Sequence, residues 1–89
     1  MLSGQEGELV SVSVAVDPRF LESLLEALAQ VTFPINPQIY HGTVTRVEFP
    51  AYATRVEEVR HALAARGFEA AQVRCVSMLE KVGAAAHQA

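Results

Sequence analysis

The stretch Val10-Ser11-Val12-Ser13-Val14-Ala15-Val16, followed directly by Asp17-Pro18, decides the fold. Every second residue of the stretch is valine and the residues between them are small, so a β-strand would carry all four valines on one face. That face has to be covered by another element if it is to leave water. Asp17 is predicted to cap a helix that follows, and Pro18 fits the first helical turn because its missing N–H is not needed there.

The residues after Asp17 predict a helix over 18–30. Its leucines recur at the i, i+3, i+4, i+7 spacing of an amphipathic helix; they are Leu21, Leu24, Leu25 and Leu28. Pro34 and Pro37 bound the next segment, and proline cannot donate a hydrogen bond to a sheet. Residues 35–41 are therefore predicted to form an edge strand or a partly irregular one.

The second half of the chain repeats this order of strand and helix. A tight turn at Gly42, with a positive φ, is predicted to lead into a strand over 43–49 that ends at Pro50. Thr54 and Glu57 match the capping box of a second helix. Gly67 is predicted to end this helix in the left-handed conformation, with Phe68 folding back on its last turn. A final strand is predicted from Gln72 to about Leu79.

The predicted order of elements is strand, helix, strand, strand, helix, strand. Short connections and right-handed crossovers favour an α+β fold, the ferredoxin-like βαββαβ arrangement, with a four-stranded antiparallel sheet and two helices on one face. We expect one domain over residues 9–82, with flexible tails at 1–8 and 83–89.

The composition excludes several classes of protein. The chain has 89 residues, of which 51% are hydrophobic and 19% charged, and this argues against disorder. The net charge of −3 argues against a nucleic-acid binder, and no apolar run approaches the roughly 20 residues of a membrane span. One cysteine excludes an intramolecular disulfide framework. The polar, acidic N-terminus is unlike a secretory signal, so we expect a cytoplasmic protein.

Two helices can cover only one face of the predicted sheet, so function or assembly is expected at the other face. With Val73, Cys75 and Leu79 turned toward the helices, an apolar patch with a polar border remains on the uncovered face. The patch is formed by Tyr40, Val44, Val76 and Met78. Such a patch suggests association, and we expect a homodimer or a higher homo-oligomer through this face or the adjacent edges.

The sequence contains no catalytic or phosphate-binding motif, and no cofactor is expected. A metal site would have to be assembled from the scattered side chains His41, His61, His87 and Cys75, and none is predicted. Cys75 alternates with Val73 in a strand and is predicted to fill the core as a small apolar residue. Glu57 and Glu58 point about 100° apart on a helix, so they do not converge as an acid/base pair. No catalytic residue is predicted.

The order of elements, together with Ile35-Asn36-Pro37-Gln38-Ile39-Tyr40-His41-Gly42 after the first helix and Arg66-Gly67-Phe68 after the second, resembles the ACT-like small-molecule-binding domains. It is especially similar to the branch called NIL, and the resemblance covers about Leu9 to Val82. The resemblance implies a regulatory or oligomerisation module that binds amino acids or similar ligands at the boundary between subunits. It also implies that Asp17 and Asn36 hold the positions where ligands lie in that family.

Two readings of different classes follow. The favoured one is a stand-alone, non-catalytic ACT-like or NIL-like regulatory or binding domain that self-associates. The alternative is a small enzyme on the same fold, either acylphosphatase-like or a cofactor-free isomerase. An acylphosphatase would need an anion-binding loop rich in Gly and Arg between the first strand and the first helix, where this chain has Asp17 and Pro18.

Overall fold

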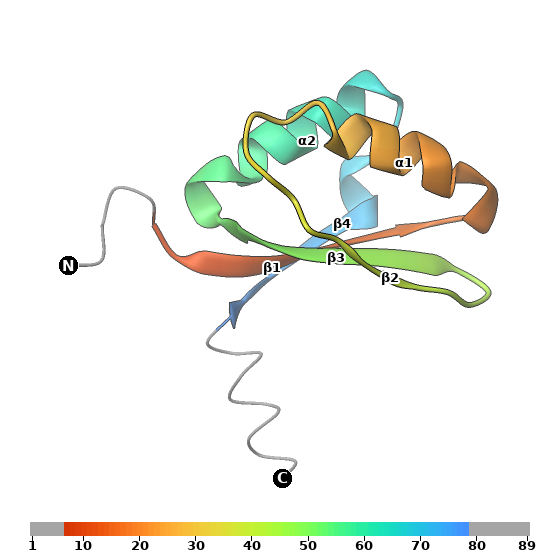
Figure 1. The fold of residues 1–89 in the computed structure, drawn as a ribbon, viewed down its shortest axis with the longest axis horizontal. Coiled ribbons are helices and arrows are strands. Elements are labelled where there is room, and N and C mark those ends of the chain that lie inside the picture. The colour runs from red at the N-terminus through yellow and green to blue at the C-terminus, as the bar shows by residue number, and fades with distance from the viewer. Residues whose placement is uncertain (1–6, 79–89) are drawn as a thin grey trace, which may run out of the picture.

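The computed structural model describes residues 7–78, in which two helices lie over one face of a four-stranded antiparallel sheet (Figure 1). The strands are β1 (Leu9–Val16), β2 (Gln38–Tyr40), β3 (Thr45–Tyr52) and β4 (Val73–Ser77). The helices are α1 (Leu21–Leu28) and α2 (Val56–Ala65), and the short 3-10 turns η1 (Pro18–Phe20), η2 (Ala53–Arg55) and η3 (Ala70–Gln72) precede α1, α2 and β4. The strands lie in the order β2-β3-β1-β4, and this α+β arrangement is compatible with a ferredoxin-like fold. β4 ends at Ser77, two residues before the predicted strand end at Leu79. Leu79 itself and the predicted tails, apart from Gly7 and Glu8, lie outside the described residues.

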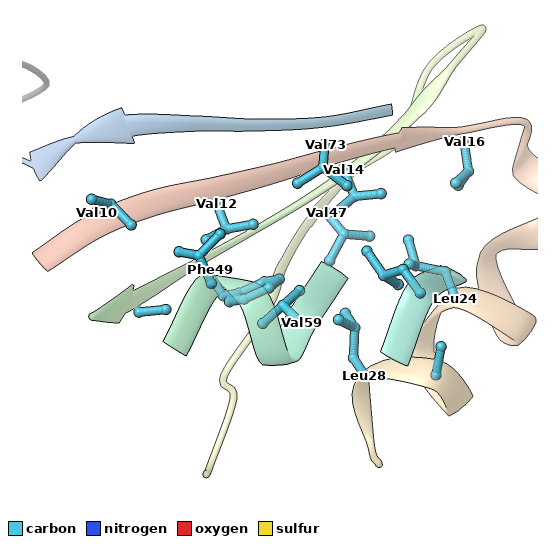
Figure 2. Close-up of a cluster of buried hydrophobic side chains, with 14 residues drawn as sticks. Val10, Val12, Val14, Val16, Leu24, Leu28, Val47, Phe49, Val59 and Val73 are labelled. Atoms are coloured by element: carbon cyan, nitrogen blue, oxygen red, sulfur yellow. The ribbon is translucent and has the colours of Figure 1, made fainter. Parts of the chain in front are cut away.

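The valine face of β1 is the centre of the core, as its alternation predicts. Val12 and Val14 are completely buried between their neighbours in the sheet and the helices (Figure 2). Leu24 and Ala27 of α1 and Val59 of α2 are the helix residues buried most completely. The helices are joined to each other at the surface, where Arg66 NH1 donates to Glu26 Oε1 at 3.0 Å.

The first helix is shorter than its leucine pattern predicts. The chain makes the turn η1 before α1 begins at Leu21, and α1 ends at Leu28 rather than Gln30. Leu24 and Leu28 are buried, whereas Leu21 and Leu25 are partly buried and pack against the edge of the core. The buried face of α1 is therefore narrower than the face that four equally buried leucines would form.

Two predictions are wrong: the end of β3 at Pro50 and the tight turn at Gly42 before it. β3 continues through Pro50, which lies opposite Ser11 of β1, and ends at Tyr52. β2 pairs only with Arg46–Glu48, so on that side of Pro50 no neighbouring strand requires an N–H. Gly42 does not have a positive φ, because the β2–β3 connection is longer than the two-residue turn that demands one.

Of the two predictions made for the ends of α2, one is confirmed and one is wrong. Gly67 has φ +89°, and Phe68 N donates to Leu63 O at 3.0 Å, so the helix ends as Gly67 and Phe68 predict. The capping box is wrong, because Thr54 lies inside η2. The residue at the N-cap of α2 is Arg55, whose side chain makes no capping hydrogen bond.

Candidate functional site

The face of the sheet opposite the helices, which we call the open face, is the first candidate site. Strand register places three rows of side chains across it. The first row is Val76, Ser11 and Pro50; the second is Arg74, Ser13, Glu48 and Gln38; the third is Ala15, Arg46 and Tyr40. The predicted orientation of β4 is confirmed for Val73 and Cys75, because they pair with Val14 and Val12 of the valine face.

Three of the four predicted interface residues are exposed, whereas Met78 is partly buried; Val44 lies in the connection between β2 and β3. Tyr40 is 52% exposed, Val44 53% and Val76 40%. Tyr40 and Val76 belong to β2 and β4, the two edge strands, so two central strands separate them. Met78 lines a hollow of about 140 Å³ together with Tyr40 and Ser11. Tyr40 and Val76 are therefore at opposite edges of the open face, and polar residues such as Ser13 and Glu48 lie in the row between theirs.

Asp17 caps the chain at the end of β1, as predicted, although the element that it caps is the turn η1. Its Oδ1 accepts a hydrogen bond from Arg19 N at 3.1 Å, and its carbonyl oxygen accepts one from Phe20 N at 2.9 Å. Arg19 Nε also lies 3.6 Å from the same Oδ1. The carboxylate is exposed, so these contacts leave it open to solvent on one side.

Asn36 is also exposed, but it lies away from Asp17. It precedes β2 by two residues, and β2 begins with Gln38 opposite Glu48. Asp17 follows Val16, which lies opposite Thr45 at the other end of β3. At ~3.4 Å per residue along a strand, the two side chains are separated by more than about 10 Å in that direction alone. One copy of the chain does not bring them together.

The predicted role of Cys75 in the core is wrong. Its side chain is on the helix side of the sheet, but β4 is an edge strand and Cys75 is exposed there. Arg60 NH2 lies 3.9 Å from Cys75 Sγ. His41 and His61 are exposed on separate elements. Among residues 7–78, no three His, Cys, Asp or Glu side chains are grouped as a metal site requires.

A cluster that the sequence did not indicate joins the loop after α1 to the first turn of α2. Glu58 Oε2 accepts a hydrogen bond from Thr32 N at 2.6 Å, and Glu58 Oε1 lies 3.4 Å from Arg55 NH1. Hydrogen bonds from Thr32, and then the charge of Arg55, lower the pKa of the Glu58 carboxyl below its ordinary value. The Arg55 guanidinium also lies 5.8 Å from the centre of the Phe33 ring. The alternation of Val31, Phe33 and Ile35 with polar residues and proline is the one sequence signal that this loop packs against the core.

No protein-family model, curated protein or solved structure matches the chain. Neither α1 nor α2, nor any other helix within the described part of the chain, has the length and apolar character that crossing a membrane requires.

Proposed function

We propose that the chain is a non-catalytic, ACT-like or NIL-like regulatory or small-molecule-binding domain that self-associates through its open face. The observation that carries the proposal is the exposure of Tyr40 and Val76 on the face of the sheet that neither helix covers (Figure 1). Exposed apolar residues with a polar border are typical of interaction surfaces. A second copy of the chain presents the same surface, so a two-fold dimer is the simplest partner.

The fold supports the same proposal. Two βαβ halves of the order β1-α1-β2 and β3-α2-β4, with each pair of strands separated by a strand of the other half, are what the ferredoxin-like βαββαβ arrangement requires. ACT-like domains are built on that arrangement, and the resemblance at Asn36, Gly42 and Gly67 extends over nearly the whole described chain.

The distance between Asp17 and Asn36 favours a ligand shared between copies. Asp17 would meet the amino group of an amino-acid ligand and Asn36 would donate to and accept from its polar atoms. Since the two residues of one copy lie far apart, a site that uses both would take Asp17 from one copy and Asn36 from another. Self-association and ligand binding are then parts of one function.

An acylphosphatase-like activity is less well supported. Such an enzyme would hold a phosphate on the backbone amides between β1 and α1. In this chain the Asp17 carboxylate already accepts a hydrogen bond from the Arg19 amide there, and its negative charge would repel a phosphate.

Sedimentation velocity over a micromolar concentration series tests the proposal. The parent chain is expected to have a mass at least twice the 9.6 kDa of one copy. Val76→Asp places a charge in the apolar patch and is expected to shift the chain toward the monomer. Ala64→Asp is the matched control, because it adds the same charge to an exposed position of α2. A parent that sediments as a monomer at every concentration, or a control that dissociates as much as Val76→Asp, would contradict self-association through the open face.

A further inference from the structure

A second hollow lies at the end of the sheet opposite to Asp17. Its volume is about 440 Å³, which is within the ~300–1,000 Å³ of small-molecule sites. Its lining comes from the start of β1, the end of β3, the turn η2 and the loop between α1 and β2. The lining residues are Leu9, Phe33, Pro34, Pro50, Ala51, Tyr52 and Arg55.

The hollow exists because β3 is longer than its neighbour β2. β2 pairs with β3 only as far as Glu48, so the stretch Pro50–Tyr52 has the loop beside it in place of a strand. The loop is held at Thr32 by Glu58 and at Phe33 by the Arg55 guanidinium. Phe33 and Pro34 also line a separate hollow of about 350 Å³ on the α1 side. The loop therefore has space on both sides and does not fill the gap next to β3.

The side chains around this hollow are mostly apolar, and one of them carries a positive charge. Leu9 is 41% exposed and Tyr52 45% exposed, and both offer apolar surface to an occupant. Of the lining residues that lie in the described part of the chain, Arg55 is the only charged one. A guanidinium has five N–H donors, and the contact with Glu58 is through NH1 at a distance of 3.4 Å. Donors therefore remain for a second anionic partner, and Glu58 itself is not part of the lining.

We propose that this hollow binds a small aromatic or branched carboxylic acid, with its carboxylate on Arg55 and its apolar part between Phe33 and Tyr52. A carboxylate and a guanidinium can form two parallel charge-assisted hydrogen bonds, which fix the orientation of the ligand. Among the described residues, the lining contains no acidic side chain, so an α-ammonium group would have no partner within it. The preferred ligand is consequently an acid without an amino group, and its site is separate from the one proposed for amino acids at Asp17.

Three probes that share one phenyl ring test whether the site requires a carboxylate and disfavours an α-ammonium group. Each is titrated into the full chain, and binding is followed in ¹⁵N–¹H correlation spectra. The probes are 3-phenylpropionate, its neutral amide 3-phenylpropanamide, and phenylalanine, which adds an α-ammonium group. We expect 3-phenylpropionate to move the amide resonances of Leu9, Phe33, Tyr52 and Arg55. The neutral amide is expected to bind about tenfold more weakly, since it loses a charge-assisted hydrogen bond. Phenylalanine is expected to bind more weakly than 3-phenylpropionate as well.

Arg55→Gln is expected to remove the preference for the acid over the amide, whereas Arg66→Gln is expected to preserve it. Arg66 is a matched control because it is also partly exposed and paired with a glutamate, but it lies at the opposite end of α2 from Arg55 and does not line the hollow. If Arg55→Gln fails to fold, the comparison of the three probes on the parent chain still tests whether the hollow prefers the acid. Equal binding of acid and amide, shifts confined to other residues, or no shift with any probe would each overturn the proposal.

Discussion

At the scale of single residues, Glu58 links the loop after α1 to α2. Its two carboxylate oxygens have different partners, Thr32 N at 2.6 Å and Arg55 NH1 at 3.4 Å. Both contacts favour the charged carboxylate, with the Thr32 hydrogen bonds as the larger cause of its lowered pKa. A carboxyl whose pKa is lower in the folded chain stabilises the fold above its ordinary pKa of 4.5, and this contribution is lost as the pH falls through the folded pKa.

The first prediction therefore concerns the effect of low pH on the contact between Glu58 and Thr32. Lowering the pH from neutral to below the folded pKa of Glu58 is expected to weaken the Thr32 contact, visible as a pH-dependent shift of the Thr32 amide resonance. In Glu58→Gln this shift should disappear, because the glutamine side chain does not titrate. Glu57→Gln is the control, since the Glu57 side chain is 89% exposed and its Oε2 lies 3.6 Å from Arg60 Nε. His61 lines a hollow together with Glu58. His61→Gln is therefore a second control, which tests whether the imidazole contributes to the pH-dependent shift of Thr32. An unchanged Thr32 shift in Glu58→Gln would contradict the prediction.

At the scale of elements, the two adjacent leucines of α1 differ in their surroundings. Leu24 is fully buried between α1 and the valine face of β1 (Figure 2). Leu25 is only partly buried, and it lines the 350 Å³ hollow under the loop. Truncation at Leu24 removes packed atoms and leaves a cavity, whereas truncation at Leu25 enlarges a space that is already open to solvent.

The second prediction is that Leu24→Ala lowers the free energy of unfolding by about 2–5 kcal/mol and Leu25→Ala by about 1 kcal/mol. The larger loss is a substantial share of the ~5–15 kcal/mol that stabilises a typical domain. Urea denaturation measures both values, and equal slopes against urea would show that the denatured state is unchanged. Equal losses for the two variants would mean that α1 is rotated from the orientation described.

Strong periodicity made the elements predictable, and contacts between distant residues limited what else could be predicted. The alternating valines of β1 and the Gly67-Phe68 ending of α2 depend on local geometry, so the sequence alone indicated both correctly. The end of β3 was predicted wrongly because Pro50 is tolerated only where β2 is absent, and this depends on pairing. The exposure of Cys75 depends on the position of β4 at the sheet edge. The contact of Glu58 with Thr32 joins residues 26 positions apart, and no local pattern indicates it.

At the scale of the whole molecule, the proposed amino-acid site needs two copies of the chain. Asp17 follows β1 at one end of the sheet, and Asn36 precedes β2 toward the other end. If both contact one ligand, each site of a dimer takes one residue from each copy, and a symmetric dimer has two such sites. A ligand that binds only the folded dimer raises its melting temperature, so thermal shift reports site occupancy.

The third prediction uses this geometry. A panel of amino acids identifies the probe, which is the one that raises the melting temperature of the parent most. Asp17→Asn should retain most of the η1 cap, and therefore the unliganded melting temperature, but lose the shift; Asn36→Ala should lose it as well. Mixing the two variants forms heterodimers in which one site lacks both residues and the other has both, so part of the shift should return. Restoration by mixing requires a shared site, because a site within one copy would stay defective in both variants. No restoration, with exchange of copies verified by mass, would place the ligand within one copy, and a panel that leaves the parent's melting temperature unchanged would remove the amino-acid site altogether.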